Sequence, residues 1–373
     1  MMMKIFNILD NYNDPRQSWK VKHSIKDIVA ITLFATIANA NEWTEIQAFA
    51  EMNEDFLRQY LTLENGIPSH DTIQRVIGIV DPKAMQQLQL EWNEMMNTDE
   101  GEKLKKILNI DGKTIRDSGN KHKKPLHVVS AWCKEDGVSL GQTVVNEKEN
   151  EIVAIPELLD DLNIKDHVVT IDAMGTQTEI AKKIIKKQGD YVLAVKGNQE
   201  TLHKDIIDYF EDGEFIDNCE KAGNYKKTIE KAHGQIEKRE YYQTDDIDWL
   251  DQKKKWADLK TIGMTVNTIE KDGEITIDKR YYINSIENDI EMFAKCVRQH
   301  WSIESMHWHL DVTFREDFNK TLDERGALNL NILRKFALAI LKTTDIGKKC
   351  SQKLKRYYIC ANPTKFLAQI LDN

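Results

Sequence analysis

The chain has 373 residues, of which 30% are charged and 41% hydrophobic, proportions that are ordinary for a globular protein and exclude a disordered or fibrous one. Its longest apolar run, residues 28–40, is shorter than the roughly 18 residues of a membrane-spanning helix, and residues 1–10 lack the pattern of a signal peptide. Five scattered cysteines without a C-x-x-C pair predict a reducing compartment and exclude a cysteine-based zinc module. We therefore expect a cytoplasmic protein without a membrane partner.

The formal net charge of −9 argues against a nucleic-acid partner, but the charge is unevenly distributed. Residues 1–100 hold 8 basic and 15 acidic side chains, whereas residues 301–373 hold 12 basic and 8 acidic ones. Two local stretches are basic, namely Lys113, Arg116, Lys121, Lys123 and Lys124, and Lys348, Lys349, Lys353, Lys355 and Arg356. Net charge alone therefore does not identify the partner.

The first part of the chain, residues 1–100, is predicted to be helical. Apolar residues recur at helical spacing over residues 28–37, 43–60 and 73–80, and Pro82 is suited to begin a further helix. A compact helical domain with a helix–turn–helix is typical of DNA binding. The alternative is an interaction domain that contacts no nucleic acid.

The middle of the chain is predicted to be α/β. The expected strands are residues 107–111, 126–133, 138–145, 167–172 and 191–195, with helices around 154–162 and over 176–187. The second and third strands are joined by Glu135-Asp136-Gly137, a strong hairpin signal. This order, β-β-β-α-β-α-β, predicts a mixed sheet that is covered by helices.

The remaining sequence divides into three regions. Residues 199–285 alternate apolar and polar side chains and predict an antiparallel β insert, which is followed by long helices over residues 290–311 and 322–341. We therefore assign residues 101–198 and 286–345 to the α/β core. Residues 346–373 are assigned to a basic C-terminal tail.

Two aspartates stand at the ends of predicted strands. Asp111 ends the first strand, directly before Gly112 and Lys113, and Asp172 ends the fourth. Ligands of open α/β sheets are held at strand ends, and an acid after an apolar strand is costly unless something pairs with it. The alternative interpretation is that each aspartate caps the turn or helix that follows.

A glutamate is predicted to lie on the buried face of a later helix. At 100° per residue, Glu304 falls in the middle of an apolar stripe. The other members of this stripe are Ile290, Phe293, Val297, Trp301 and Trp308. A buried glutamate needs a partner, which is either a basic side chain or a metal ion.

Three carboxylates from two strand ends and one helix suit hard divalent cations. Mg²⁺ prefers oxygen ligands, and two ions can clamp a phosphate, one activating the nucleophile and the other stabilising the leaving oxygen. A rival zinc site would comprise His300, Glu304, His307 and Asp311, although their spacing differs from the H-E-x-x-H of metalloproteases.

In its motifs and their order, the chain resembles DDE transposases of bacterial insertion sequences, in the branch that includes the H-repeat-associated proteins. The matching stretches, in family order, are Ile110-Asp111-Gly112-Lys113, Thr170-Ile171-Asp172-Ala173-Met174, Val195-Lys196-Gly197-Asn198-Gln199, His233-Gly234-Gln235-Ile236-Glu237, and His300-Trp301-Ser302-Ile303-Glu304 with His307-Trp308. Each motif alone is weak, but five in order over most of the chain are specific.

The resemblance implies a ribonuclease-H-like catalytic domain, with an associated helical domain before it and a β insert between Asp172 and Glu304. It implies Asp111, Asp172 and Glu304 as the catalytic and metal-binding triad, holding Mg²⁺ or Mn²⁺, with two ions expected. The residues from which we expect DNA contacts are Lys113, Arg116, Lys196, Asn198, His300, Trp301 and His307.

The activity that the resemblance implies is cut-and-paste DNA transposition. Metal-activated water would cut one strand at the transposon end, and the freed 3′-hydroxyl would attack another phosphodiester. The expected partner is double-stranded DNA, bound by a homodimer at the bacterial nucleoid. Two alternatives stay open, namely a non-catalytic DNA- or protein-binding descendant of the fold and a ribonuclease-H-like nuclease without strand transfer.

Overall fold

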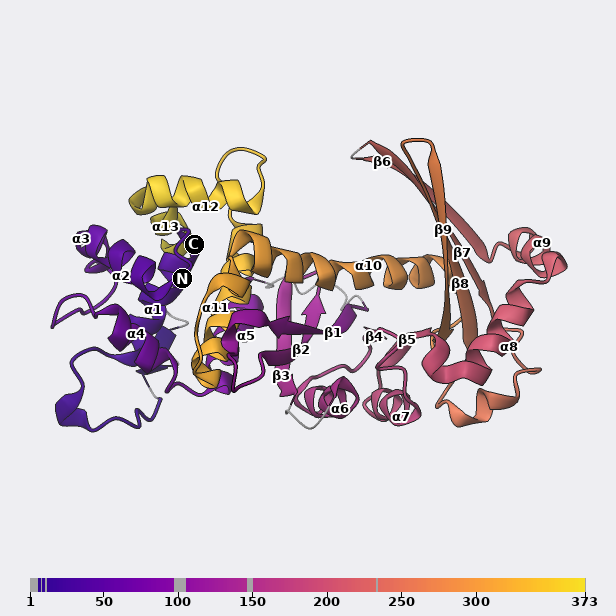
Figure 1. The fold of residues 1–373 in the computed structure, drawn as a ribbon, viewed down its shortest axis with the longest axis horizontal. Coiled ribbons are helices and arrows are strands. Elements are labelled where there is room, and N and C mark those ends of the chain that lie inside the picture. Colours follow the sequence, from indigo (N-terminus) through magenta and orange to yellow (C-terminus); the bar gives the residue numbers. More distant parts are fainter. Residues whose placement is uncertain are drawn as a thin grey trace.

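A computed structural model describes residues 6–7, 9–10, 12–96, 105–145, 150–232 and 234–372. His233, the first residue of one of the five motifs, lies outside these ranges. Helices gather at one end of the molecule, and a long sheet extends from them to the other end (Figure 1). In the described part of the chain, no helix is both long and apolar enough to cross a membrane.

The N-terminal region is helical, as the sequence predicts. Its elements are a 3₁₀ turn (Ser18–Lys20), α1 (Ile25–Ile37), α2 (Trp43–Met52), α3 (Glu54–Leu57), α4 (His70–Ile77) and α5 (Pro82–Met96). Apart from Lys26, every residue of α1 is buried, so α1 is the central helix around which the others pack. The single helix predicted over residues 43–60 is interrupted, because the Asn53 side chain donates to the Phe49 carbonyl (2.8 Å) and ends α2 there.

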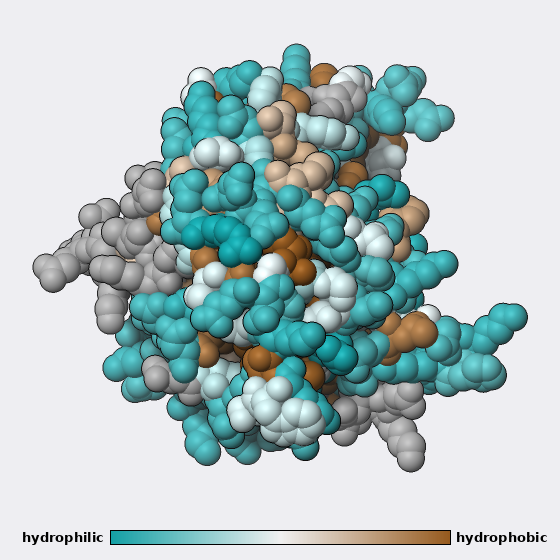
Figure 2. Space-filling view, turned by 90° about the vertical axis from the view of Figure 1, so that its left-hand side faces the viewer, coloured by the Kyte–Doolittle hydropathy of each residue, from teal (hydrophilic) through white to brown (hydrophobic). Residues whose placement is uncertain are grey.

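The C-terminal residues do not form the expected tail but two helices, α12 (Gln352–Ala361) and α13 (Pro363–Asp372). Ile359 of α12 lies in the same apolar cluster as α1. So do Leu367 and Leu371, which are four residues apart on one face of α13. The two ends of the chain therefore lie close together (Figure 1). This end of the molecule presents mainly hydrophilic side chains to solvent, with small apolar areas between them (Figure 2).

One mixed sheet of nine strands organises the rest, in the order β3-β2-β1-β4-β5-β9-β8-β7-β6. The strands are β1 (Ile107–Ile115), β2 (Leu126–Cys133), β3 (Val138–Val145), β4 (Val168–Ile171), β5 (Asp190–Val195), β6 (Tyr225–Ala232), β7 (Gln235–Thr244), β8 (Thr261–Lys271) and β9 (Glu274–Asn284). Strands β1, β4 and β5 are parallel to one another, and β2, β3 and β6–β9 add antiparallel pairs. The predicted mixed α/β sheet is confirmed.

Helices cover both faces of this sheet. On one face, α6 (Glu151–Asp161) and α7 (Thr178–Lys186) share an apolar cluster with β1, β2 and β4. On the other face, α10 (Ile290–Trp308) packs Phe293, Cys296 and Val297 on residues of β1, β4 and β5. Figure 1 shows α10 running along the sheet on the side opposite α6 and α7. A π-helical turn (His309–Thr313) then leads toward α11 (Glu324–Thr343).

The region predicted as a β insert begins with two helices that the sequence reading missed. These are α8 (Glu200–Phe210), whose buried Leu202, Ile206 and Phe210 follow a helical spacing, and α9 (Gly213–Ala222). Strands β6–β9 follow as expected, and β9 pairs antiparallel with β5. The insert therefore extends the sheet of the core rather than forming a separate one.

Candidate active site

Asp111, Asp172 and Glu304 line one cavity of about 240 Å³. They reach it from β1, from the end of β4 and from α10. The sheet and α10 therefore bring three side chains that are far apart in the sequence to one cavity. Lys196, His300 and Trp301, three of the expected DNA contacts, line the same cavity.

Asp111 does not end its strand, because β1 continues to Ile115 along its antiparallel partner β2. What ends here is the parallel pairing with β4, whose last pair is Ile110 with Ile171. Asp111 and Asp172 are the next residues of these two strands, so both stand at the carboxyl edge of the parallel pair. The boundary predicted for the strand was too early, and both aspartates lie at the sheet edge where the ligand site is predicted.

Asp172 also caps the turn that follows it. Its Oδ1 accepts hydrogen bonds from the backbone amides of Met174 (3.1 Å) and Gly175 (3.3 Å). The capping interpretation and the cavity interpretation therefore both hold for this residue.

Glu304 is exposed, not buried as the helical wheel predicted. Trp301 and Trp308, which were counted as core, are 38% and 55% exposed. The buried face of α10 instead includes Phe293, Ala294, Cys296, Val297, Ile303 and Met306. Within the described residues Glu304 forms no ion pair, so the predicted alternative of a salt bridge is not observed there.

The acidic side chains of the cavity act on one another and are opposed by a lysine. Burial, followed by the charges of Asp172, Glu151 and Glu304, raises the pKa of Asp111 to about 7. The pKa of Asp172 is also raised, chiefly by burial and then by Glu151, whereas Lys196 acts to lower it. Neighbouring carboxylates raise one another's pKa because their negative charges repel. Such oxygen donors are the ligands that a hard divalent cation prefers. No three carboxylate, imidazole or thiol groups of the described residues lie close enough together to enclose a metal ion.

Two of the expected DNA contacts are organised around this cavity. The Thr170 hydroxyl bonds His300 Nδ1 (2.9 Å) and Asn109 Oδ1 (2.8 Å), which fixes the orientation of the imidazole. Burial lowers the pKa of His300 to about 4, so the ring is neutral at pH 7. Beside it, the Arg280 guanidinium lies 4.7 Å from the centre of the Trp301 ring.

Two other expected DNA contacts, Lys113 and His307, face acidic side chains of the chain. The Lys113 side chain is 9% exposed, and its Nζ pairs with Asp311 (2.7 Å) and Glu316 (3.0 Å) in the interior. His307 lies with Nδ1 3.6 Å from Asp111 Oδ2, and burial lowers its pKa to about 3. Both therefore face carboxylates of the chain in this structure rather than solvent. His307 does so from α10 itself, and the acids that hold Lys113 belong to the segment after α10.

Arg116 and Asn198 lie outside the lining of the cavity. Arg116 is exposed and pairs with Asp317 (3.3 Å). Asn198 Nδ2 donates to the Ala173 carbonyl (2.6 Å), which ties the loop after β5 to the turn after Asp172. Asn198 therefore supports the geometry of the site through the backbone.

Sequence reasoning missed Glu151, the first residue of α6. Its charge acts on both aspartates, and its Oε1 lies 2.7 Å from His127 Nε2. A glutamate in the first turn of a helix is a common favourable feature of helix termini, so nothing in the local sequence distinguishes it.

A buried lysine of α11, which donates to Ser130 of β2, provides a test of how burial changes a pKa in this fold. Lys335 is 1% exposed, donates to Ser130 Oγ and Gln142 Oε1 (both 2.6 Å), and burial lowers its pKa to about 7. Its usual pKa is 10.5, so the unfolded chain binds the proton more tightly and this lysine destabilises the fold most at pH 7 and below.

We expect Lys335→Met to remove this pH dependence. The difference in unfolding free energy between variant and wild type should change by about 1 kcal/mol per pH unit between pH 7 and 10, favouring the variant most at pH 7. Urea denaturation across this range measures it. Lys182→Met, on the exposed surface of α7, is the control and should show a constant difference. A constant difference for Lys335→Met as well would show that burial does not lower the pKa of Lys335 in the folded protein.

The fold and site define a mixed α/β protein with three carboxylates gathered at the edge of its parallel strands. Residues 102–340 match the family model described as the transposase DDE domain, and residues 6–93 match the model described as DDE_Tnp_1-associated. The chain belongs to this DDE transposase family, as the five motifs predicted.

Two relatives from Escherichia coli support the same family. "Putative transposase YncI" of Escherichia coli O157:H7 is 38% identical over 99% of this chain and 95% of its own length. "H repeat-associated putative transposase YhhI" of Escherichia coli (strain K12) is 37% identical over 99% of this chain and 97% of its own length. A piggyBac transposase, solved as a synaptic complex with hairpin DNA, is 12% identical with a TM-score of 0.43, covering 100% of this chain and 82% of its own.

Proposed function

We propose that the protein is a DNA transposase that cleaves DNA and joins it to a new site by metal-dependent phosphoryl transfer. The observation that carries this proposal is the shared cavity of Asp111, Asp172 and Glu304. The strand order β3-β2-β1-β4-β5, with β1 antiparallel to β2 and parallel to β4, supports a ribonuclease-H-like core. DDE transposase domains generally use divalent metals, which agrees with the donor set of the cavity.

In this proposal the three carboxylates hold Mg²⁺ or Mn²⁺, with two ions expected. Their side chains must close in around the ions, because in the described residues no three such groups lie close enough together to enclose one. When bound, such ions activate the attacking oxygen and stabilise the leaving one. Lys196 and Arg280 line the cavity and supply positive charge for a DNA phosphate. Thr170 holds His300 as a neutral hydrogen-bonding group beside the same position. Exposed Arg116 and Trp301 are proposed to contact DNA further out.

The arrangement of the chain suggests a division of labour. We propose that residues 1–100 bind transposon ends, that residues 101–198 and 286–345 form the catalytic core, and that residues 199–285 form the insert. Because α1 is buried, any DNA contact of the N-terminal region must come from the other helices and the loops around it. Transposition joins two ends, so we also propose a dimer on DNA.

The test uses the purified full-length protein and labelled DNA that flanks its own gene, with a supercoiled plasmid as target. We expect strand cleavage and plasmid joining with Mg²⁺, and neither with EDTA. Cleavage without joined products would indicate a ribonuclease-H-like nuclease instead. Specific DNA binding without cleavage in Mg²⁺ or Mn²⁺ would contradict the proposal and support the non-catalytic alternative.

A further inference from the structure

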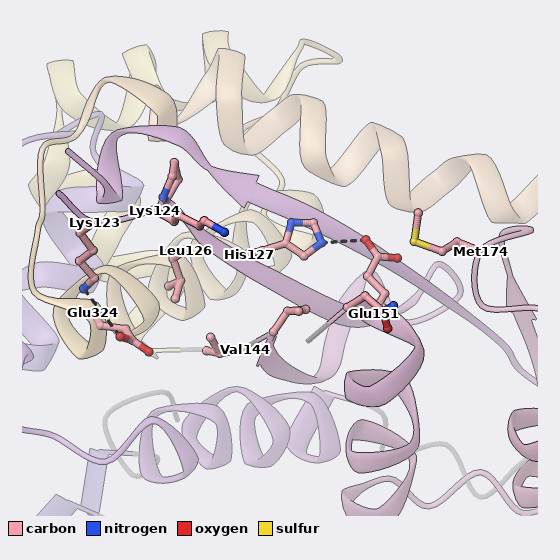
Figure 3. A pocket seen from close by; sticks show the side chains of 11 residues that line it. Lys123, Lys124, Leu126, His127, Val144, Glu151, Met174 and Glu324 are labelled. Carbon is pink, nitrogen blue, oxygen red and sulfur yellow. Dashed lines mark hydrogen bonds and ion pairs between the residues drawn. The ribbon is translucent and has the colours of Figure 1, made fainter. Parts of the chain in front are cut away.

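A histidine–glutamate pair lies beside the acidic cavity. Glu151 follows Asn150, whose side chain caps α6 by accepting from the Ile152 amide (3.1 Å). Glu151 Oε1 lies 2.7 Å from Nε2 of His127, which belongs to β2. In Figure 3 the two side chains point at each other at one end of a pocket, and Met174 lies beyond Glu151. The pair therefore joins the start of α6 to the sheet.

Both ends of this pair are fixed. The Nδ1 of His127 bonds the hydroxyl of Thr114 (2.8 Å), its cross-strand partner in β1. Both ring nitrogens are thus occupied, and the Glu151 side chain is only 15% exposed. The carboxylate is therefore held in one position rather than moving freely at the surface.

The pair packs directly on the residue after Asp111. A Cβ at Gly112 would lie 2.1 Å from Glu151 Oε1 and 2.6 Å from His127 Nε2, so a side chain at this position would collide with the pair. The charge of Glu151 also raises the pKa of Asp111 and of Asp172. Glu151 therefore acts on the site both through the backbone of β1 and through its charge.

We propose that Glu151, held by His127, is a positioning residue that fixes β1 at Gly112 and keeps a fourth negative charge beside Asp111 and Asp172, so that these aspartates bind a divalent cation more tightly. The inference rests on the proposed metal-dependent function. Residues that support metal ligands from outside typically change metal affinity by 10–100-fold when they are replaced.

The same pocket contains a matched control. At its far end Glu324 pairs with Lys123 (3.7 Å), as Figure 3 shows. Glu324 is thus an acid of the same pocket that already has its own basic partner. Glu324→Gln removes an equal charge without touching Gly112 or His127.

The experiment titrates Mn²⁺ into the DNA-free, full-length protein by calorimetry and measures the Mg²⁺ concentration for half-maximal DNA cleavage. We expect Glu151→Gln to weaken Mn²⁺ binding, and to raise the Mg²⁺ concentration for half-maximal cleavage, by about tenfold or more. The amide oxygen of the variant still accepts from His127, so the fold is preserved. Glu151→Asp keeps the charge and should lose less than Glu151→Gln. Glu324→Gln should match wild type.

Wild-type Mn²⁺ affinity in Glu151→Gln, or equal losses in the Asp and Gln variants, would overturn the inference. A melting temperature lowered equally in both variants, with unchanged metal affinity, would show a structural role alone. Wild-type protein that binds Mn²⁺ but does not cut DNA would refute the proposed function, while the affinities still decide the role of Glu151. A wild-type protein that binds no Mn²⁺ would overturn both.

Discussion

Replacing Asp111 with asparagine should abolish DNA cleavage without weakening the fold. The variant keeps the size of the side chain but removes one anionic oxygen donor of the cavity, so we expect cleavage to fall by at least about 10³-fold. Burial raises the pKa of Asp111 to about 7, which means that the charged carboxylate is unfavourable in the metal-free protein. The melting temperature of Asp111→Asn at pH 8 without metal should therefore equal or exceed that of the wild type.

Single-turnover cleavage and thermal unfolding measure the two effects separately. Asp172→Asn and Glu304→Gln should lose cleavage to a similar extent, because all three acids share the cavity. Asp161→Asn, on the exposed surface at the end of α6, is the control and should retain full cleavage. Cleavage by Asp111→Asn within tenfold of wild type would show that Asp111 is not part of the active site.

The second large effect is expected at Arg356, which is fully buried in α12. Its guanidinium donates to the carbonyls of Thr36 (2.8 and 3.1 Å), Ala40 (3.2 Å) and Thr313, and it lies 4.3 Å from the centre of the Phe314 ring. These carbonyls end α1 and the π-helical turn that follows α10. One side chain thus joins the C-terminal helices, the N-terminal helices and the segment that continues the Glu304 helix.

We expect Arg356→Met to lower the free energy of unfolding by about 3–5 kcal/mol, because several buried carbonyls lose their donors together. Arg356→Lys should recover little of this, since one ammonium cannot reach acceptors on both sides. Urea denaturation measures the loss. Lys353→Ala, on the exposed side of the same helix, should change stability by no more than about 0.5 kcal/mol. If Arg356→Met lowered the free energy of unfolding by less than about 1 kcal/mol, Arg356 would not stabilise the contact between these three segments.

The elements that the sequence predicts well are those with strong local signals. Strands β2 and β3 match their predicted bounds, because alternating apolar residues flank a turn in which Gly137 has a positive φ of 70°. Asp111 and Asp172 could be proposed for the site because each follows an apolar strand segment. The order of the motifs along the chain was sufficient to identify the family.

What the sequence does not reveal depends on contacts between distant segments. Lys113 is held by acids some 200 positions later, Arg356 by carbonyls of α1, and Glu151 by His127 on a neighbouring strand. The helical wheel misplaced Glu304 because it treated two surface tryptophans as core, and only packing against the sheet decides which face of α10 is buried. Local periodicity carries no information about any of these partners.

The proposed function depends on Asp111, Asp172 and Glu304 forming one divalent-cation site. The most direct test is the anomalous difference map of a crystal of the full-length protein grown with Mn²⁺. We expect a peak between these three carboxylates, with oxygen ligands at about 2.0–2.3 Å. A well-ordered cavity without a peak, or a peak bound by other residues alone, would contradict it.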